Sequence, residues 1–522
     1  MLPPGLTAFV QTLIDILLLG FLLGLLVLSV TVFGLWFEDR FIQKKHAVRR
    51  NYPLIGRFRY FFEHLGEFFR QYFYAHDREE LPFNRAQRSW VYRAAKDLDN
   101  TVPFGSTKNT LVPGEVVFAS SAWSVLEKDS VESPAMMIGP HCRQPYAARS
   151  LYNASAMSYG AISRPAVQAL SRGAGMAGCW MNTGEGGLSE YHEEGGCDLV
   201  FQIGTARYGV RDAEGNLSDD RLEEVAGHSR VKMFEIKLSQ GAKPGKGGIL
   251  PASKVTPEIA RIRGIPEGEA SISPNRHPDV ASEDELLDLI NRVRNVTGKP
   301  VGIKTVVGDW EWLEDLFLAV HRRGIESAPD FITVDSGDGG SGAAPMPLMD
   351  DVGLNLSESL PLVVDLLNGY GLRERIRVIA SGKLITPNRV AWALAMGADF
   401  CTSARGFMFA LGCIQALQCN ENTCPTGVTT HDPKLQRGLV PRDKAERVRH
   451  FHAHLVREVG MIAHSCGVSE PRGLTRKHAR MMTGDARSVR LDELWPPVEK
   501  NAYLDHGRRS EVEPMIRMPM YR

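Results

Sequence analysis

Residues 300–335 read PVGIKTVVGDWEWLEDLFLAVHRRGIESAPDFITVD and contain one complete β-α-β unit. The two apolar, β-branched runs at 300–306 and 331–335 are typical of buried strands. The stretch between them, 310–323, spaces its apolar residues as a helix does. A helix that joins two strands favours their parallel pairing. This segment therefore predicts an α/β fold with a parallel sheet.

The same alternation extends on both sides of this unit. Helical patterns lie between most of the strands, and the helix expected at 163–177 begins with Ser163 as N-cap and Pro165 in its first turn. Eight strands over ~250 residues predict a (β/α)8 TIM barrel rather than an open sheet. The other strands are expected at 151–157, 178–183, 199–203, 233–238, 377–380 and 400–402, with further helices at 282–296 and 387–396.

The amino-terminal part of the chain has the composition of a membrane helix. Residues 16–37 contain no charged side chain, and the expected span covers about residues 13–37. Basic residues follow it, whereas residues 2–14 carry no charge, so the positive-inside rule predicts a single-pass membrane protein with its N-terminus outside and its catalytic part in the cytoplasm. A cleaved signal peptide is the alternative, although its apolar core is shorter and its charges precede the core. The basic residues are Arg40, Lys44, Lys45, Arg49 and Arg50.

These patterns divide the chain of 522 residues into four expected regions. They are a membrane anchor with its basic flank (1–50), a juxtamembrane region (51–150), the barrel (151–440) and a C-terminal helical extension with a tail (441–522), whose clear helix is expected at 442–466. In residues 57–74 aromatic and charged residues alternate, which predicts an amphipathic helix either at the bilayer surface or packed on the globular domain. The charge balance of 61 Lys+Arg against 61 Asp+Glu argues against a nucleic-acid binder.

Glycine and polar residues gather at the expected carboxyl ends of the strands, where barrels place their function. The ends of the last two strands contain Ser381-Gly382 and Arg405-Gly406, which suit an anion because backbone N–H groups and an arginine can reach it. Each loop alone fits a plain turn. The joint pattern over eight strand ends predicts a phosphorylated cofactor or substrate.

Two charged residues stand out at these ends. Lys304 closes an apolar strand, where burying an ammonium is costly without an anion beside it. The anion beside Lys304 could be a substrate carboxylate, the electron-rich end of a flavin, or an acidic side chain that forms a structural salt bridge. Glu185, surrounded by glycines, is expected to be an exposed carboxylate that points into the pocket, or else a solvated turn acid.

Three of the eight cysteines, Cys413, Cys419 and Cys424, lie close together, and Pro425 follows the last of them. A zinc site needs four ligands, and although His431 is available the spacing matches no common zinc motif. Three thiolates with a Cys-Pro step favour an iron–sulfur site. Buried structural cysteines are the alternative.

Five motifs resemble those of the FMN-binding synthase domain of glutamate synthase, over roughly residues 85–470. They are NTGEGG (182–187), SQGAKPGKGG (239–248), VTPEIARIRG (255–264), SGDGGSGAAP (336–345) and LGCIQALQCNENTCPTGV (411–428). The resemblance implies a barrel that holds FMN, and a [3Fe-4S] cluster bound by Cys413, Cys419 and Cys424. It also implies that Lys304 contacts flavin and substrate and that Glu185 lies where ammonia arrives.

The remaining site residues are expected at the same strand ends. The FMN contacts are Ser155, Ala156, Met157, Asn182, Thr183, Lys304, Asp335, Gly339, Gly340, Ser381, Gly382, Arg405 and Gly406. The substrate contacts are Arg207, Gln240, Lys243 and Lys246. The sequence departs from the family where Asp338 replaces the usual His, and neither an N-terminal amidotransferase domain nor a C-terminal β-helix is expected. It looks most like the short, membrane-anchored glutamate synthase-related proteins.

The predicted function is the reductive amination of 2-oxoglutarate, or of a similar 2-oxo acid, by ammonia or an amine with hydride from reduced FMN. The expected partners are a ferredoxin-like electron donor, a separate glutaminase and membrane lipid, without nucleic acid. One alternative is an FMN and iron–sulfur oxidoreductase that acts on a different amine or hydroxy acid and exchanges electrons with a membrane carrier. Another is a non-catalytic redox or scaffold subunit.

Overall fold

The computed structural model describes residues 3–506 and residue 508, which fold into two compact units. The first unit comprises residues 1–86 and the second residues 87–522. The second unit contains the region that the sequence assigns to the barrel, together with the segment before it.

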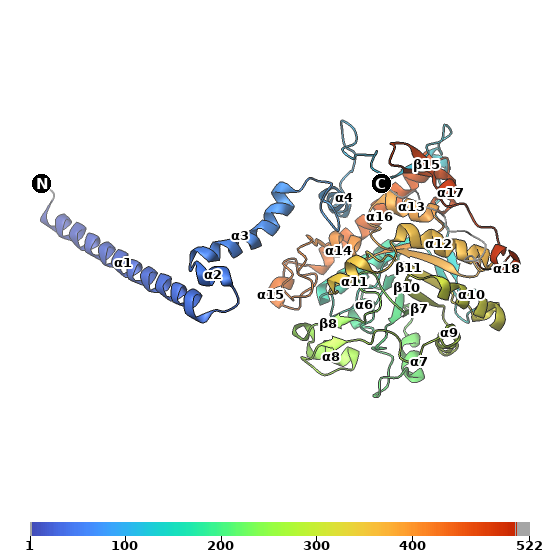
Figure 1. The fold of residues 1–522 in the computed structure, drawn as a ribbon, viewed down its shortest axis with the longest axis horizontal. Coiled ribbons are helices and arrows are strands. Elements are labelled where there is room, and N and C mark those ends of the chain that lie inside the picture. Colours follow the sequence, from blue (N-terminus) through green and yellow to red (C-terminus); the bar gives the residue numbers. More distant parts are fainter. Residues whose placement is uncertain (1–2, 507, 509–522) are drawn as a thin grey trace. The chain divides into compact units, whose positions relative to one another are not determined.

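The second unit is built around a closed barrel of eight parallel strands within the described residues (Figure 1). The strands follow one another around the barrel in chain order and the last pairs with the first, so that no strand edge stays open. They are β4 (Tyr152–Ala154), β5 (Met181–Asn182), β6 (Leu199–Ile203), β7 (Val231–Lys237), β10 (Val301–Val306), β11 (Phe331–Asp335), β12 (Arg377–Ser381) and β13 (Phe400–Ser403). The predicted (β/α)8 barrel is confirmed.

The helices around the barrel begin and end at residues suited to capping. The hydroxyls of Ser163 and Ser282 accept hydrogen bonds from the first turns of α5 and α9. Gly178 ends α5 with a φ of 69°, a conformation that favours glycine, and the strand expected from residue 178 begins at Met181 instead. These helices are α5 (Arg164–Ala177), α6 (Glu190–Glu193), α7 (Asp219–Gly227), α8 (Pro257–Arg263), α9 (Glu283–Thr297), α10 (Glu311–Arg323), α11 (Met346–Asp351), α12 (Leu356–Gly369), α13 (Pro387–Ala395) and α14 (Arg405–Leu411).

A hairpin that precedes the barrel fills its amino-terminal end. Its strands β2 (Met136–Ile138) and β3 (Tyr146–Ala148) pair antiparallel, and Ile138, Tyr146 and Ala148 are buried in one apolar cluster with barrel residues. Those barrel residues are Trp180, Val200, Met233, Phe331, Ile379 and Phe400. These apolar residues lie toward the starts of their strands. The polar side chains of the barrel therefore lie toward its carboxyl-terminal end.

The carboxyl-terminal region adds a helix and a small sheet. The helix α16 (Pro441–Ser465) corresponds to the one expected at 442–466 and packs against α5, α13 and α14. Strands β14 (Ala479–Met482) and β15 (Ser488–Arg490) then form an antiparallel sheet with β1 (Val116–Phe118). The sequence did not indicate these strands because they are short and lack apolar alternation.

The other short elements connect these parts. They are α4 (Arg85–Ala95), β8 (Ile249–Leu250), β9 (Ser271–Ile272), α15 (Pro433–Gln436), α17 (Leu491–Leu494), α18 (Ala502–His506) and the turns η3 (Glu127–Asp129), η4 (Ala252–Lys254), η5 (Ile325–Ser327), η6 (Pro471–Gly473) and η7 (Arg476–His478). The antiparallel pair β8–β9 and helix α8 lie in the long connection after β7.

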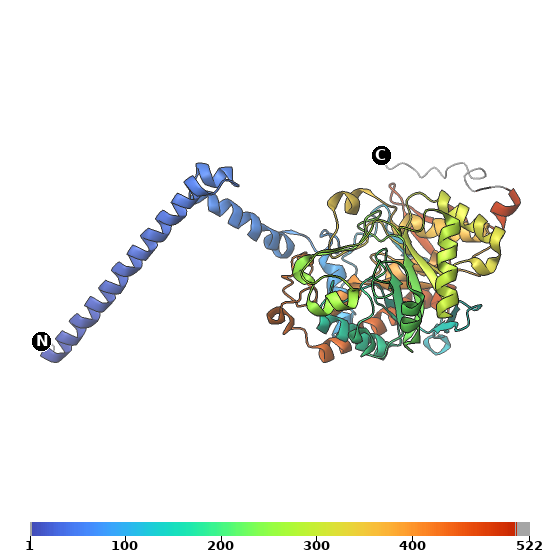
Figure 2. The ribbon, with the colours of Figure 1, turned by 90° about the horizontal axis from the view of Figure 1, so that it is seen from below.

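The first unit begins with α1 (Pro4–Phe37), an uninterrupted apolar helix (Figure 2). Among the described residues, Gly5–Ile42 is the one helical stretch long and apolar enough to cross a membrane by length and composition, with a mean hydropathy of 2.8. Four elements follow it: η1 (Glu38–Ile42), α2 (Ala47–Asn51), α3 (Ile55–Phe69) and η2 (Arg70–Tyr74). The last two cover the amphipathic helix expected at 57–74.

Candidate active site

Lys304 lies near the end of β10, where 7% of its side chain is exposed. Its Nζ lies 3.3 Å from Oδ2 of Asp335, which ends the adjacent strand β11. The same carboxylate oxygen accepts a hydrogen bond from the Gly241 amide at 3.0 Å. Burial lowers the pKa of Lys304, but Asp335 and Glu235 outweigh it and raise the pKa above its ordinary value. The Lys304 ammonium therefore stays charged at neutral pH.

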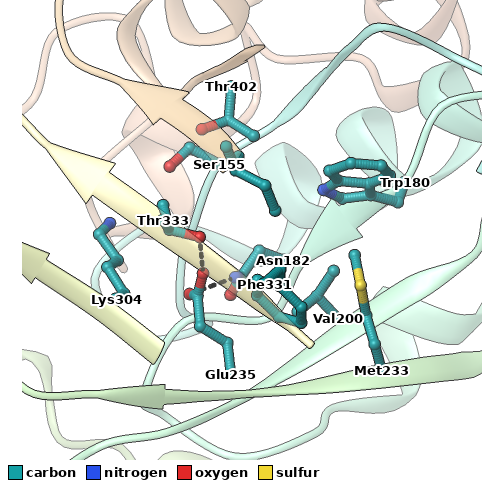
Figure 3. Close-up of a pocket in the computed structure, with 11 residues that line it drawn as sticks. Ser155, Trp180, Asn182, Val200, Met233, Glu235, Lys304, Phe331, Thr333 and Thr402 are labelled. Carbon is teal, nitrogen blue, oxygen red and sulfur yellow. Dashed lines mark hydrogen bonds between the residues drawn. The ribbon is translucent and has the colours of Figure 1, made fainter. Parts of the chain in front are cut away.

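Glu235, on β7, accepts three hydrogen bonds inside the barrel. Asn182 Nδ2 and Gln202 Nε2 donate to its Oε1 at 2.8 and 2.7 Å. The Thr333 hydroxyl donates to its Oε2 at 2.6 Å. Figure 3 shows Asn182 and Thr333 directed at Glu235, with Lys304 on the neighbouring strand. Between these side chains lies a cavity of about 10 Å³, room for one water molecule.

Glu235 is absent from the predicted site, although its strand contains a signal for it. Met233, Glu235 and Lys237 occupy alternate positions of β7 and so share a face. Met233 and Glu235 line the cavity, while Lys237, at the strand end, forms an ion pair with Glu185. Two charged residues at this spacing in a buried strand indicate a polar barrel interior.

Glu185 lies in the glycine-rich turn after β5 and is largely buried, with 15% of its side chain exposed, rather than exposed as expected. Its Oε1 lies 2.9 Å from Nζ of Lys237. A Cβ added at Gly248 would lie 2.2 Å from this oxygen, so a glycine is needed there. Burial raises the pKa of Glu185, but Lys237 and Lys243 outweigh it and bring the pKa below its ordinary value.

The predicted substrate residues differ in their surroundings. Lys243 is buried, its Nζ donates to a backbone carbonyl oxygen at 3.3 Å, and burial lowers its pKa to about 8. Arg207 is also buried, and its guanidinium forms an ion pair with Asp279. Gln240 is half-buried and Lys246 is exposed. The structure thus brings Lys243 to the site, engages Arg207 elsewhere and leaves Lys246 at the surface.

The glycines of the loops after β11 and β12 allow close approach at the rim. A Cβ added at Gly382, whose φ is 139°, would lie 2.3 Å from Cβ of Ser336. A Cβ added at Gly340 would lie 2.8 Å from Nε of Arg405. Ser381 ends β12 beside Gly382 and is itself buried. On this side of the rim, glycine backbone therefore lies next to the side chain of an arginine.

The other residues predicted to bind the cofactor fall into three groups: those that line the cavity, those that hydrogen-bond within the protein, and those that lie in loops. Ser155 and Asn182 line the cavity together with Lys304. The Thr183 hydroxyl donates to the next carbonyl oxygen in the chain at 3.0 Å. The Gly406 amide donates to a serine hydroxyl at 3.1 Å, so that it already has a partner. The remaining members, Ala156, Met157 and Gly339, lie in the loops after β4 and β11.

Asp338, the residue at which the sequence was expected to depart from the family, forms an ion pair. Its Oδ2 lies 2.6 Å from Nζ of Lys383, and its other oxygen accepts a hydrogen bond from the Ser336 hydroxyl. Burial raises the pKa of Asp338, but these two partners outweigh it and hold the pKa below its ordinary value. The carboxylate is therefore charged at neutral pH.

Cys413, Cys419 and Cys424 lie on the loop that follows α14. Burial, with a smaller contribution from the nearby thiols of Cys419 and Cys424, raises the pKa of Cys413 to about 12. The loop backbone is left-handed at Gln415 and Leu417, with φ values of 60° and 56°. Non-glycine residues adopt this conformation where their surroundings demand it.

Buried cations flank the cysteine loop. Lys254 Nζ donates to the carbonyl oxygens of Cys419 at 2.7 Å and of Ala161 at 3.2 Å, and Arg88 donates to that of Ile414 at 3.3 Å. Among the described residues, no three His, Cys, Asp or Glu side chains converge on a site for a single metal ion. The prediction of an iron–sulfur cluster therefore rests on three neighbouring thiols of one loop and the buried cations beside them.

The chain is similar to glutamate synthases over most of its length. The family model described as a conserved region in glutamate synthase matches residues 110–469. The chain is 38% identical over 519 residues to the glutamate synthase large subunit-like protein YerD of Bacillus subtilis (strain 168), covering 92% of this chain and 98% of that protein. It is 33% identical over 345 residues to the archaeal glutamate synthase (NADPH) of Methanocaldococcus jannaschii, covering 65% of this chain and 62% of that protein.

The matches to solved structures are weaker. A mutant flavocytochrome b2 with benzoylformate is 15% identical, with a TM-score of 0.45, and the match covers 77% of this chain and 80% of that one. The assignment of the fold therefore rests on this chain's own strand order.

Proposed function

The chain belongs to the glutamate synthase family and is an enzyme of the glutamate synthase type, and from this premise we propose that it catalyses the FMN-dependent reductive amination of 2-oxoglutarate or a similar 2-oxo acid. In the balanced reaction, 2-oxoglutarate, an ammonium ion, two protons and two electrons give glutamate and water. The observation that supports this most is the placement of Lys304, Asp335 and Glu185 at one barrel rim bordered by glycine loops.

The residues at this rim fit FMN. The absence of a Cβ at Gly340 and Gly382 lets the side chains of Arg405 and Ser336 pack directly against these loops, and Arg405 suits a phosphate. The charged Lys304 ammonium suits the negative charge of a reduced flavin. Bound there, FMN would supply the hydride that reduces the imine formed from the oxo acid and ammonia.

Lys304 binds and polarises the oxo acid in this proposal. Its ammonium donates a hydrogen bond to the oxygen that becomes more negative as ammonia adds to the carbonyl carbon. Asp335 and Glu235 keep the ammonium protonated, and the Gly241 amide fixes the Asp335 carboxylate. In a buried site such a preoriented charge stabilises the transition state more than it would in water.

Glu185 transfers the proton of the incoming nitrogen. Lys237 keeps the Glu185 carboxylate ionised, so it can attract an ammonium ion to the site and take up a proton from the nitrogen as that nitrogen adds to the carbonyl carbon. Lys243, close to the same carboxylate, binds a carboxylate of the substrate. Arg207, Gln240 and Lys246 are the other proposed substrate contacts.

Cys413, Cys419 and Cys424 would hold a [3Fe-4S] cluster, which when bound would supply electrons one at a time. Lys254 and Arg88 would offset the negative charge of the thiolates. The proposed donor is a ferredoxin-like protein, and the use of glutamine would need a separate glutaminase.

We further propose that α1 anchors the protein in a membrane, with its N-terminus outside and the barrel in the cytoplasm. The helix is long and apolar, and Arg40, Lys44 and Lys45 follow it. Protease added to vesicles with the cytoplasmic face inside is expected to leave the barrel intact. Cleavage of the barrel in sealed vesicles would contradict this topology.

Anaerobic assays on detergent-purified, flavin-containing protein test the activity. With 2-oxoglutarate, ammonium and reduced ferredoxin, glutamate is expected. A flavin that is fully reducible but yields no glutamate would overturn the proposed substrate and favour an oxidoreductase for another amine or hydroxy acid.

The variant Cys419→Ser tests the cluster. We expect it to lose bound iron and the paramagnetic signal of the cluster while flavin absorbance is retained. Cys466→Ser, at the buried C-cap of α16, is the matched control and should keep both. Unchanged iron content in Cys419→Ser would refute the ligand assignment.

A further inference from the structure

In the first unit, residues 38–57 form an elbow between α1 and α3 that is organised by a buried carboxylate. Asp39 is fully buried and accepts hydrogen bonds from Arg49 Nη2 at 2.6 Å, Arg57 Nε at 2.7 Å and the Leu54 amide at 3.1 Å. Bonds between a carboxylate and guanidinium groups are the strong, geometrically specific kind. The chain between the two helices is therefore held in one conformation.

Backbone packing reinforces the elbow. A Cβ added at Gly56 would lie 2.9 Å from Cα of Arg49, so α2 and α3 meet through their backbones. Leu54 has a φ of 64°, which side-chain-bearing residues rarely adopt, and its amide is held by Asp39. The rings of His46 and Tyr60 lie 4.5 Å apart. The start of α3 is thus positioned by several independent contacts.

An apolar stripe runs along α3 and η2. Its members recur at spacings of three and four residues and so share one helix face. They are Phe58, Phe61, Phe62, Leu65, Phe68, Phe69 and Tyr72. Phe58, Phe61 and Phe62 are 59%, 57% and 61% exposed, and the opposite face carries Arg59, Glu63, Glu67 and Arg70.

We propose that the apolar stripe lies in the headgroup layer of the bilayer that α1 enters, an inference that rests on the proposed anchoring. The apolar side chains of α1 are exposed along the helix, and the elbow joins α1 to α3 through a structured connection within one unit. Aromatic residues favour the membrane–water interface, and an amphipathic helix lies in its plane. Because the opposite face carries two arginines and two glutamates, aromatic burial rather than charge should dominate the binding.

Photolabelling of the full-length protein tests this proposal. The protein is reconstituted into phosphatidylcholine vesicles, with or without phosphatidylglycerol, that contain a diazirine-bearing lipid, and labelled residues are mapped by mass spectrometry. We expect label in residues 58–72 as well as in α1, in both kinds of vesicle. Label in α1 alone would overturn the interfacial helix and leave the anchor standing, whereas no label in α1 would refute the anchor itself.

Two variants and a control sharpen the test. Replacing Phe61, Phe62, Phe68 and Phe69 by Ser should abolish label in 58–72 and spare that in α1. Glu63→Gln with Glu67→Gln, on the opposite face, should change neither. If the stripe is protected from hydrogen exchange but unlabelled, it packs on protein, either the barrel unit or a second copy, and the proposal is wrong.

Asp39→Asn tests the elbow separately. It weakens two ion pairs without removing an apolar residue, and we expect severalfold less label in 58–72 with unchanged label in α1. If Asp39→Asn carries as much label as the wild type in both segments, the elbow does not position α3.

Discussion

Glu235 and Glu185 are both buried acids of the barrel, yet their surroundings differ in kind. Neutral side chains on or beside β5, β6 and β11 donate three hydrogen bonds to Glu235. Glu185 faces the ammonium of Lys237, and its carboxylate packs against Gly248, where an added Cβ would collide with it. Neutral donors from several strands fix a carboxylate in place. A cation keeps a carboxylate ionised, and a neighbouring glycine lets that carboxylate pack closely against the backbone.

In the proposed reaction, this difference separates a positioning acid from a reactive one. Glu235 holds the barrel interior together and adds negative charge beside Lys304. Glu185 sits at the rim, on a turn rather than a strand, where a small nucleophile can be deprotonated. Substitutions at the two positions should therefore affect different observables.

The largest effect is expected from Glu185→Gln. Loss of a general base typically lowers kcat by about 10²–10⁴-fold, and flavin content should not change. The exposed Glu194→Gln on the same segment serves as control and should behave as the wild type. A kcat for Glu185→Gln close to that of the wild type would remove the proposed distinction between the two acids.

Glu235→Leu should act on stability instead. It leaves three buried donors without their acceptor, so we expect a loss of about 3 kcal/mol or more in unfolding free energy, since each orphaned group costs ~1–3 kcal/mol. Glu235→Gln keeps one acceptor oxygen and should lose less. Denaturant unfolding followed by circular dichroism measures both variants, and equal losses would show that the hydrogen bonds are not what holds this site.

The smallest effect concerns Lys243 and pH. Burial places its pKa at about 8, so its charge is present below that pH and is lost above it. The KM for the oxo acid should therefore rise about fivefold between pH 8 and pH 9, as the protonated fraction falls. Lys243→Met should raise KM at pH 7 and flatten this dependence, whereas the exposed Lys246→Met should not. A pH profile that Lys243→Met leaves unchanged would remove Lys243 from the substrate site.

Much of the fold could be predicted from local patterns. Most of the eight strands contain a short apolar or β-branched run, and caps such as Ser163 and Gly178 mark the helix ends, so the barrel could be predicted from the alternation of strands and helices. Lys304 and Glu185 were found because their residue types are unusual at strand ends. Their roles, and those of the three cysteines, stay predictions.

The sequence by itself determined the order of the barrel strands and of the main helices between them, the apolar amino-terminal helix and the spacing of the cysteine loop, because each is a property of residues close together in the chain. Only the tertiary structure decided which groups meet. The three donors to Glu235 come from different parts of the barrel, the hairpin β2–β3 fills its amino-terminal end, and Asp39 gathers two arginines. Such pairings depend on closure of the barrel and on turns between distant segments, and periodicity carries no information about them.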